Sequence, residues 1–385
     1  MKPSVAVYLV LAIASGLGLV GKMPLLKRVL PWSPVFLILI MSVALLLPLF
    51  WAIALRFKQV ISVLTIAALG ISFFIMFPKV EKLHQIGRGS DQPDCVIVAG
   101  TEMMSGHWPY QRDKMWTKNP MSCGPGWVAI QAPIIARLDY RWDLAILWAL
   151  SLAGIIFALG WDWASEVITL SALCPGVWLA ASDGTDFLTF GICITALFLL
   201  SSRFRTARWA WAMGVGLVAQ FRFPTLLVPS FMTKQLGTKW SVVATAIAFS
   251  FQGIFLFWNA PSFISDGPLH VISKFTHMHL LSTRLLPVLV EILIPLIVSA
   301  AVAMWIDVHP RTESEWTVLA YLTLVLGLPA IFDLIAKVHS NVNLISALGL
   351  WEGGLWLTAC LPLAALLLTS SMRADRVGCL SDVNA

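Results

Sequence analysis

The sequence predicts an all-α, multi-pass membrane protein, and three observations support this fold class. Hydrophobic residues make up 58% of the 385 positions and charged residues only 12%, whereas a soluble domain carries about 25% charged residues. The mean hydropathy is +0.83. Apolar runs of the length needed to cross a bilayer, about 20 residues, recur along the chain. The chain is therefore expected to form one polytopic membrane domain over residues 1–385.

Ten apolar runs are expected to span the membrane as helices. The first follows Lys2 and is interpreted as a retained anchor, because it lacks the small-residue cleavage site of a signal peptide and further spans follow it. The runs lie at residues 4–21, 34–55, 59–77, 144–161, 164–181, 187–202, 240–258, 285–306, 316–336 and 346–370.

Residues 207–233 differ from these runs, because basic residues flank both ends and Arg222 interrupts the middle. An arginine at mid-bilayer is costly unless it faces a polar cavity. A hairpin of two short helices with Arg222 at its tip would keep both basic flanks on one side of the membrane. A single tilted span with Arg222 reaching toward the interface is the alternative.

Counting this hairpin as two gives about twelve membrane segments with both termini in the cytoplasm. Short basic loops support the orientation, although Lys22, Lys27 and Arg28 fall on the outside. The formal charge of +6 is accounted for by these flanks, so no nucleic-acid partner is expected. The outer side then receives four polar segments, at residues 79–143, 182–186, 259–284 and 337–345.

The segment 79–143 is the largest outer loop. Short interfacial helices are expected at Lys79 to Gln85 and at Asp94 to Ser105, and tryptophans suit the depth of lipid headgroups. Cys95 and Cys123 lie in this loop. They either form a disulfide, if the loop faces an oxidising compartment, or remain two separate thiols.

Asp91 is the first candidate for chemistry, because it follows a span by about a dozen residues and stands after Gly89 and Ser90. A carboxylate at the mouth of a membrane cavity can accept a proton from a hydroxyl group. The alternative is a helix N-cap, a role that aspartate commonly fills. Asp94, Asp183 and Asp186 are secondary candidates: Asp94 suits the first turn of a helix, and Asp183 suits a turn or an N-cap.

Cationic side chains are candidates for binding a phosphate group. Those expected near the outer surface are Arg222, Lys274, His277, His279 and Arg284. The pair His277 and His279 is not accompanied by an acidic or cysteine cluster, so no metal site and no other cofactor is expected.

The order of motifs in the first outer loop resembles that of GT-C glycosyltransferases. After Asp91 come Gly106-His107-Trp108-Pro109-Tyr110, then Asn119-Pro120, Pro125-Gly126 and Pro133. The pattern is most similar to glycosyltransferase family 87, the mannosyltransferases that use polyprenyl-phosphate-mannose. The run from Gly214 to Pro229 resembles a further segment of that family. Two extra spans before the loop, and Asp183-Gly184-Thr185-Asp186 in place of a polar amide turn, depart from the pattern.

The resemblance implies an inverting transferase that moves a sugar from a polyprenyl-phosphate donor to a lipid or glycan acceptor. Asp91 would be the base, the cations would bind the donor phosphate, and Gly106, Trp108, Pro109 and Tyr110 would form a substrate loop. The protein would lie in a bacterial inner membrane among membrane lipids, with its site facing the exterior. Rival interpretations are a transporter or flippase of an anionic or lipid-linked solute, another lipid-glycan enzyme, and a non-catalytic subunit.

Overall fold

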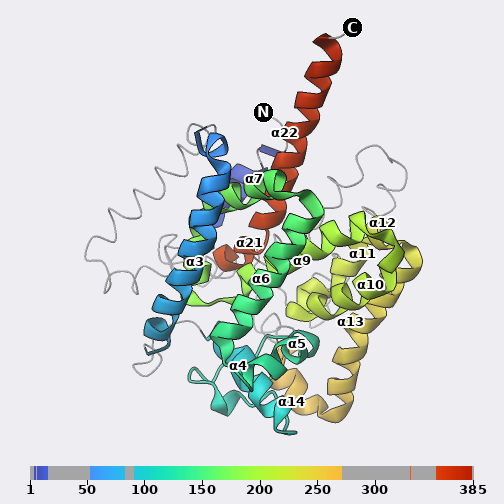
Figure 1. The fold of residues 1–385 in the computed structure, drawn as a ribbon. Coiled ribbons are helices and arrows are strands. Elements are labelled where there is room, and N and C mark those ends of the chain that lie inside the picture. The colour runs from blue at the N-terminus through green and yellow to red at the C-terminus, as the bar shows by residue number, and fades with distance from the viewer. Residues whose placement is uncertain are drawn as a thin grey trace, which may run out of the picture.

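The computed structural model describes residues 4–5, 7–15, 53–82, 91–270, 330 and 353–383, with the side chains of the last segment described for 356–373. The described residues are all helical or irregular, and they contain no β-strand. Five of their helices are long and apolar enough to cross a membrane, or six if one bent pair is counted. The predicted all-α, multi-pass class is therefore confirmed at this level (Figure 1).

The long helices match predicted spans closely. Their ends lie within a few residues of those of the predicted apolar runs, except that the last stretch begins at residue 356 and its predicted run at residue 346. They are α3 (Lys58–Glu81), α6 (Tyr140–Leu159), α9 (Asp186–Arg203), α13 (Thr238–Trp258) and the stretch Trp356–Arg373, which crosses from α21 (Gly353–Thr358) into α22 (Leu361–Val383). The predicted spans 285–306 and most of 34–55 and 316–336 lie outside the described residues.

The predicted span 164–181 is wrong as a single straight helix. Its residues form α7 (Trp161–Ala172) and α8 (Pro175–Asp183), which meet at 83°. Pro175 causes the break, because proline has no N–H and disfavours helical backbone in the residue before it. Cys174 is accordingly extended. The hydroxyl of Tyr8, in the helical residues 7–15, donates to the Leu170 carbonyl at 2.7 Å and so satisfies a group near the break.

The segment 207–233 turns back on itself. The chain first forms α10 (Arg208–Val218) and then two short 3-10 turns, η4 (Ala219–Phe221) and η5 (Phe223–Leu227). It returns through α11 (Val228–Phe231) and α12 (Thr233–Leu236). Its two ends adjoin, because a Cβ on Gly237 would lie 3.1 Å from the Arg208 guanidinium. Arg222 is the extended residue between the two turns, at the point of reversal.

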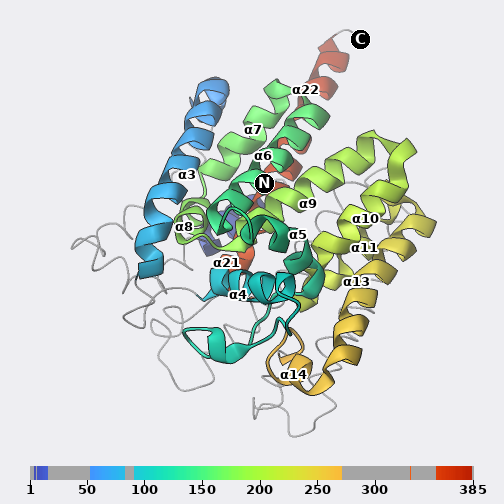
Figure 2. The same cartoon turned by 60° about the horizontal axis from the view of Figure 1, so that its bottom comes forward.

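Short helices cover one end of the bundle. They are α4 (Gln92–Met104), η2 (Arg112–Lys114), α5 (Pro125–Ile135) and α14 (Ala260–Ser265), and Figure 2 shows them gathered at the end of α13. The helix predicted from Asp94 to Ser105 is α4, whereas Lys79–Glu81 form the last turn of α3. Helix α5 is apolar but has only 11 residues, too few to cross a bilayer.

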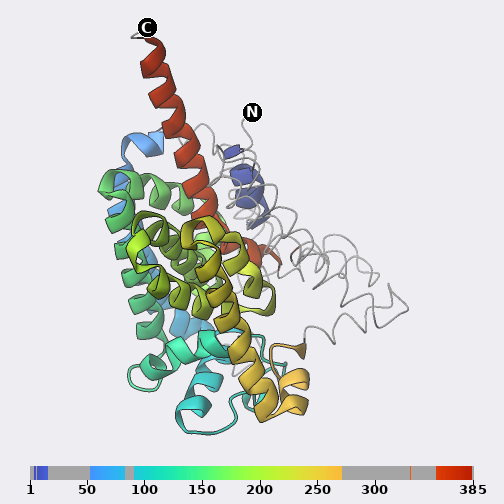
Figure 3. The same ribbon diagram turned by 90° about the vertical axis from the view of Figure 1, so that its right-hand side faces the viewer.

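The opposite end carries an ion network, with α22 projecting beyond it (Figure 3). Lys58 and Arg373 each pair with both Asp162 and Glu166, at N–O distances of 2.7 to 3.1 Å. These contacts join the first turns of α3 and α7 to α22. Between the two ends, Trp148 donates to Thr189 at 2.7 Å and fixes α6 against α9.

Candidate functional site

Asp91 occupies the N-cap position of α4 but does not cap the helix with its side chain. Its Oδ2 instead accepts hydrogen bonds from Thr117 Oγ1 at 2.8 Å and from Asn119 Nδ2 at 2.7 Å. The N-cap alternative therefore gives the position of Asp91 correctly, but the hydrogen bond from a helix N–H to its side chain, which a cap would make, is not present. The carboxylate is half-buried and is oriented by two neutral donors from one loop.

Arg222 forms a buried ion pair with Asp186, the first residue of α9. The two side chains are only 3% and 0% exposed, and the guanidinium contacts both carboxylate oxygens at 3.0 and 3.2 Å. Trp127 of α5 donates to the same carboxylate at 2.9 Å. The Arg222 guanidinium also lies 4.3 Å from the centre of the Phe221 ring, so aromatic faces and a carboxylate together compensate the buried charge.

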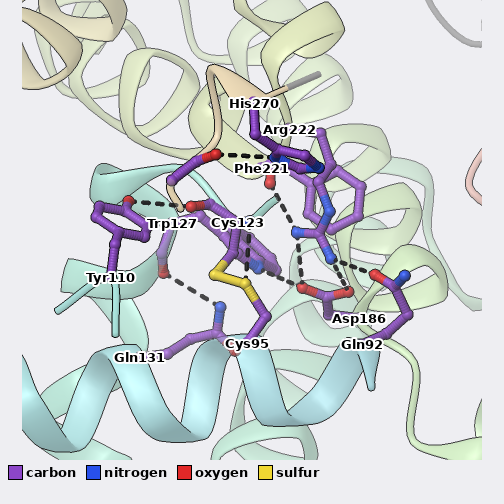
Figure 4. The surroundings of a disulfide bond; sticks show 11 residues. Gln92, Cys95, Tyr110, Cys123, Trp127, Gln131, Asp186, Phe221, Arg222 and His270 are labelled. Atoms are coloured by element: carbon purple, nitrogen blue, oxygen red, sulfur yellow. Dashed lines mark hydrogen bonds and ion pairs between the residues drawn. A yellow bond between two sulfur atoms is a disulfide. The ribbon is translucent and has the colours of Figure 1, made fainter. Parts of the chain in front are cut away.

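Gln92 connects this ion pair to Asp91. The Gln92 Oε1 atom accepts from Arg222 at 2.9 Å (Figure 4). Arg222 also donates to the Phe221 carbonyl at 2.8 Å. Both terminal nitrogens of Arg222 are thus engaged twice, once by Asp186 and once by another acceptor. The structure thus brings Arg222 into contact with Gln92, the residue that follows Asp91 in the chain. Both Asp91 and Arg222 were predicted as site residues.

A disulfide joins Cys95 of α4 to Cys123, with Cα atoms 6.1 Å apart. Of the two alternatives for these cysteines, the structure has the disulfide (Figure 4). The Tyr110 hydroxyl donates to the Cys123 carbonyl at 3.0 Å. Immediately after Cys123, a Cβ on Gly124 would overlap the Gln220 carbonyl. Only glycine permits this approach of the loop to the turn that carries Arg222.

Asp94 lies one helical turn after Asp91 and faces two negative charges. Burial, followed by the charges of Asp91 and Glu81, raises the pKa of Asp94 to about 7, and the Trp116 indole N–H partly offsets this rise. A carboxyl group with a pKa near neutrality is able to exchange protons under physiological conditions. The pair formed by Asp91 and Asp94 therefore brings together two carboxyl groups with different environments.

The predicted substrate-loop residues are mainly packed against α13 and α14. Trp108 donates from its indole to Ser262 at 2.8 Å and contacts the ring of Tyr110 edge-on. Tyr110 is 1% exposed and Pro109 is buried, whereas Gly106 is exposed and has a φ of +73°. Gly106 makes the turn, and the other three residues anchor the loop. Contact of these residues with a substrate stays a prediction.

The two acids of the turn 183–186 occupy different positions. Asp183 ends α8 and is 5% exposed, and Gly184 follows in the left-handed conformation with a φ of +67°. The N-cap of α9 is Thr185, so the N-cap role considered for Asp183 is wrong. Asp186 is the acid that reaches the site, through Arg222.

Lys274, His277, His279 and Arg284 lie outside the described residues, so their phosphate-binding role stays a prediction. The preceding histidine, His270, is 3% exposed and its Nδ1 is 2.9 Å from the Gly267 carbonyl. No group of three or more His, Cys, Asp or Glu side chains is arranged to hold a metal ion in the part of the chain that the structure describes.

Sequence reasoning missed Asp143, which lies in α6 and is fully buried. Neither of its carboxylate oxygens has a hydrogen-bond partner, and the charge of Asp186 acts on it. The predicted span began at residue 144 and left Asp143 as the last residue of the outer loop, so the available signal was an acid at the edge of a span. For Gln92, Thr117 and Trp127 no comparable signal exists, because ordinary polar loops and apolar helices contain the same residue types.

No protein-family model matches this chain, and no curated protein or solved structure is significantly similar to it.

Proposed function

We propose that the protein is an inverting glycosyltransferase that uses a polyprenyl-phosphate sugar as donor, with a GT-C-like fold of about twelve membrane segments. The proposal rests on the motif resemblance and on one structural observation. The Asp91 carboxylate is held by Thr117 and Asn119 and does not cap α4. The next residue in the chain, Gln92, contacts Arg222 of the buried ion pair with Asp186. The chemistry requires a carboxylate oriented in this way, and an ordinary helix cap does not.

The proposed reaction needs one proton acceptor and one leaving phosphate. The O–H bond of the acceptor breaks, and its proton passes to the Asp91 carboxylate. The acceptor oxygen bonds to the anomeric carbon from the face opposite the phosphate, and the bond from that carbon to the phosphate oxygen breaks. The polyprenyl phosphate leaves with the electron pair. Base catalysis of this kind contributes about 100- to 10,000-fold to the rate.

Arg222 has a different role in this proposal from the phosphate contact predicted from the sequence. Its four terminal N–H bonds are directed to Asp186, Gln92 and Phe221. Arg222 therefore fixes the start of α4, and through it Asp91, while its charge is balanced by Asp186. Binding of the donor phosphate is assigned to the predicted cations Lys274, His277, His279 and Arg284, which lie outside the described residues.

The proposed location is the bacterial inner membrane, with Asp91 on the exterior side and membrane lipids carrying both substrates. The disulfide between Cys95 and Cys123 supports this orientation, because disulfides persist in oxidising compartments. Lys58, Arg203 and Arg208 lie at helix ends away from α4, and Arg373 ends the last apolar stretch within α22. This distribution agrees with the bias of positive charge toward the cytoplasm.

The test is sugar transfer by the purified protein from a panel of polyprenyl-phosphate sugars, with wild type beside Asp91→Asn. Asparagine retains the size of Asp91 and can still accept from Thr117 and Asn119, but it is not a base. The matched control is Asp113→Asn, an exposed acid of the same loop. Transfer by wild type and by the control, with loss in the folded Asp91 variant, supports the proposal. Full activity of Asp91→Asn would refute the role of the base.

A transporter of an anionic solute is the second candidate, and the break between α7 and α8 favours it. Discontinuous membrane helices bind ions and substrates in many secondary transporters, and the 83° bend here has that form. Uptake of candidate solutes into proteoliposomes, together with absence of transfer across the donor panel, would favour this function over the transferase.

A further inference from the structure

The two ends of the segment 207–233 carry a group of basic residues that the proposed reaction does not use. From residue 187 to residue 265 the chain contains no Asp or Glu. Apart from Arg222, the Lys and Arg residues of this range all lie close to the ends of the segment. We call them the basic patch: Arg203, Arg205, Arg208, Lys234 and Lys239.

The fold brings the two halves of the basic patch together. A Cβ on Gly237 would lie 3.1 Å from the Nη1 atom of Arg208. Arg205 is three residues from Arg208 along the chain, and Lys239 is two residues from Gly237. Helix α9 runs from the candidate site to the patch, so the patch lies at the end of the bundle away from α4 (Figure 1).

The cations of the basic patch lack the acidic partners that other cations have at this end of the molecule. Lys58 and Arg373 each pair with Asp162 and Glu166. Four members of the patch form no ion pair with any residue that the structure describes; they are Arg203, Arg205, Arg208 and Lys239. The Nε atom of Arg208 is also buried without a hydrogen-bond partner. Because buried donors normally have an acceptor, an anionic acceptor from outside the chain fits this position.

Two helix starts meet at the basic patch. Helix α10 begins at Arg208 and α13 begins after Gly237, and no side chain caps either start. The N–H groups in the first turn of a helix favour anions, phosphate groups among them. Trp209 is 61% exposed, and the Lys239 ammonium lies 5.2 Å from the ring centre of Trp240. Tryptophan favours the depth of lipid headgroups, so the patch is expected at the membrane surface.

We infer that the basic patch binds the phosphate of an anionic phospholipid headgroup, in the leaflet opposite to Asp91. Anionic lipids attract basic residues next to membrane helices, and the arginine fork matches the oxygens of a phosphate group. The exposed Trp209 favours a lipid over a soluble phosphate, because its ring offers an apolar surface to acyl chains. The inference concerns the far end of the molecule and does not depend on the proposed transferase.

The test is a titration of the purified protein in detergent with phosphatidylglycerol, followed by native mass spectrometry, with phosphatidylcholine as the neutral reference. The variant combines Arg205→Gln with Lys239→Gln, and both side chains are exposed, so the fold should be retained. One cation near an anionic lipid surface contributes about 5-fold to the binding constant. The double variant should therefore bind phosphatidylglycerol about 25-fold more weakly and phosphatidylcholine equally well.

The matched control is Arg56→Gln, an exposed cation just before α3 at the same end of the molecule, which should leave phosphatidylglycerol binding unchanged. If the double variant does not fold, the single variants decide, with a loss of about 5-fold each. The inference is overturned if wild type binds both lipids equally, if the patch variants bind phosphatidylglycerol like wild type, or if Arg56→Gln weakens binding as much as they do. Displacement of the lipid by inorganic phosphate at equal concentration would also overturn it, because the ligand would then be a soluble anion.

Discussion

Replacing Arg222 by methionine should strongly destabilise the protein, because it leaves the Asp186 carboxylate buried without its cation. Asp186 is 0% exposed and receives two of the four hydrogen bonds that Arg222 donates through its terminal nitrogens. Removing one partner of a buried ion pair costs about 3–5 kcal/mol of unfolding free energy. The total stability of a folded protein is only about 5–15 kcal/mol, so the expected loss is a large part of it.

The double variant Arg222→Met with Asp186→Leu separates this effect from a simple loss of packing. If an uncompensated charge causes the loss, removing both charges should recover most of it, because apolar replacement of a buried pair is often neutral. The control is Arg141→Met, which breaks the pair with Asp139 at side-chain exposures of 39% each. That change should cost at most about 1 kcal/mol.

The assay is equilibrium unfolding in detergent, followed by tryptophan fluorescence, for wild type, the two single variants, the double variant and the control. The signal comes from 18 tryptophans and therefore reports global unfolding, to which Trp127 beside Asp186 contributes. The reasoning is refuted if the losses of the single variants add in the double variant. It is also refuted if Arg222→Met is no more destabilising than Arg141→Met.

Three further predictions concern the same end of the molecule. Gly124→Ala should impair folding, because the added Cβ would overlap the Gln220 carbonyl. The control Gly253→Ala should be tolerated, because its Cβ would meet no atom within 4 Å, and expression levels and thermal midpoints check both variants. Reducing the disulfide between Cys95 and Cys123 should cost about 3 kcal/mol, visible as a lower midpoint with reductant, and maleimide labelling of both cysteines without reductant would contradict it. Asp143→Leu should raise the unfolding free energy by about 1–3 kcal/mol, since it removes a buried carboxyl without a partner; a lower midpoint would mean that Asp143 has a partner it needs.

The long helices could be predicted from hydropathy, because a span needs a continuous apolar run and little else. The ends of α3, α6, α9 and α13 fall within a few residues of the predicted runs. The bend after α7 could also have been predicted, because Pro175 lies inside the predicted span and proline interrupts a helix. It was missed because the apolar run continues across the break, and hydropathy does not register backbone geometry.

The ion pair between Arg222 and Asp186 could not be predicted from the sequence. The two residues lie on different elements, and their contact depends on how the turn after α10 packs against the start of α9. The sequence indicated that a buried arginine needs a partner, but it did not identify which of several acids would supply it. The orientation of Asp91 was similarly open, since an N-cap and a base occupy the same position on α4.

The most direct test of the central claim is the acceptor-dependent release of polyprenyl phosphate by purified wild type and by Asp91→Asn, measured with folding-matched samples. The account predicts release by wild type only when donor and acceptor are both present. It predicts a loss of about 100- to 10,000-fold in the variant, the contribution of a general base. Equal rates for the two proteins, or no release by wild type with any donor, would contradict the account.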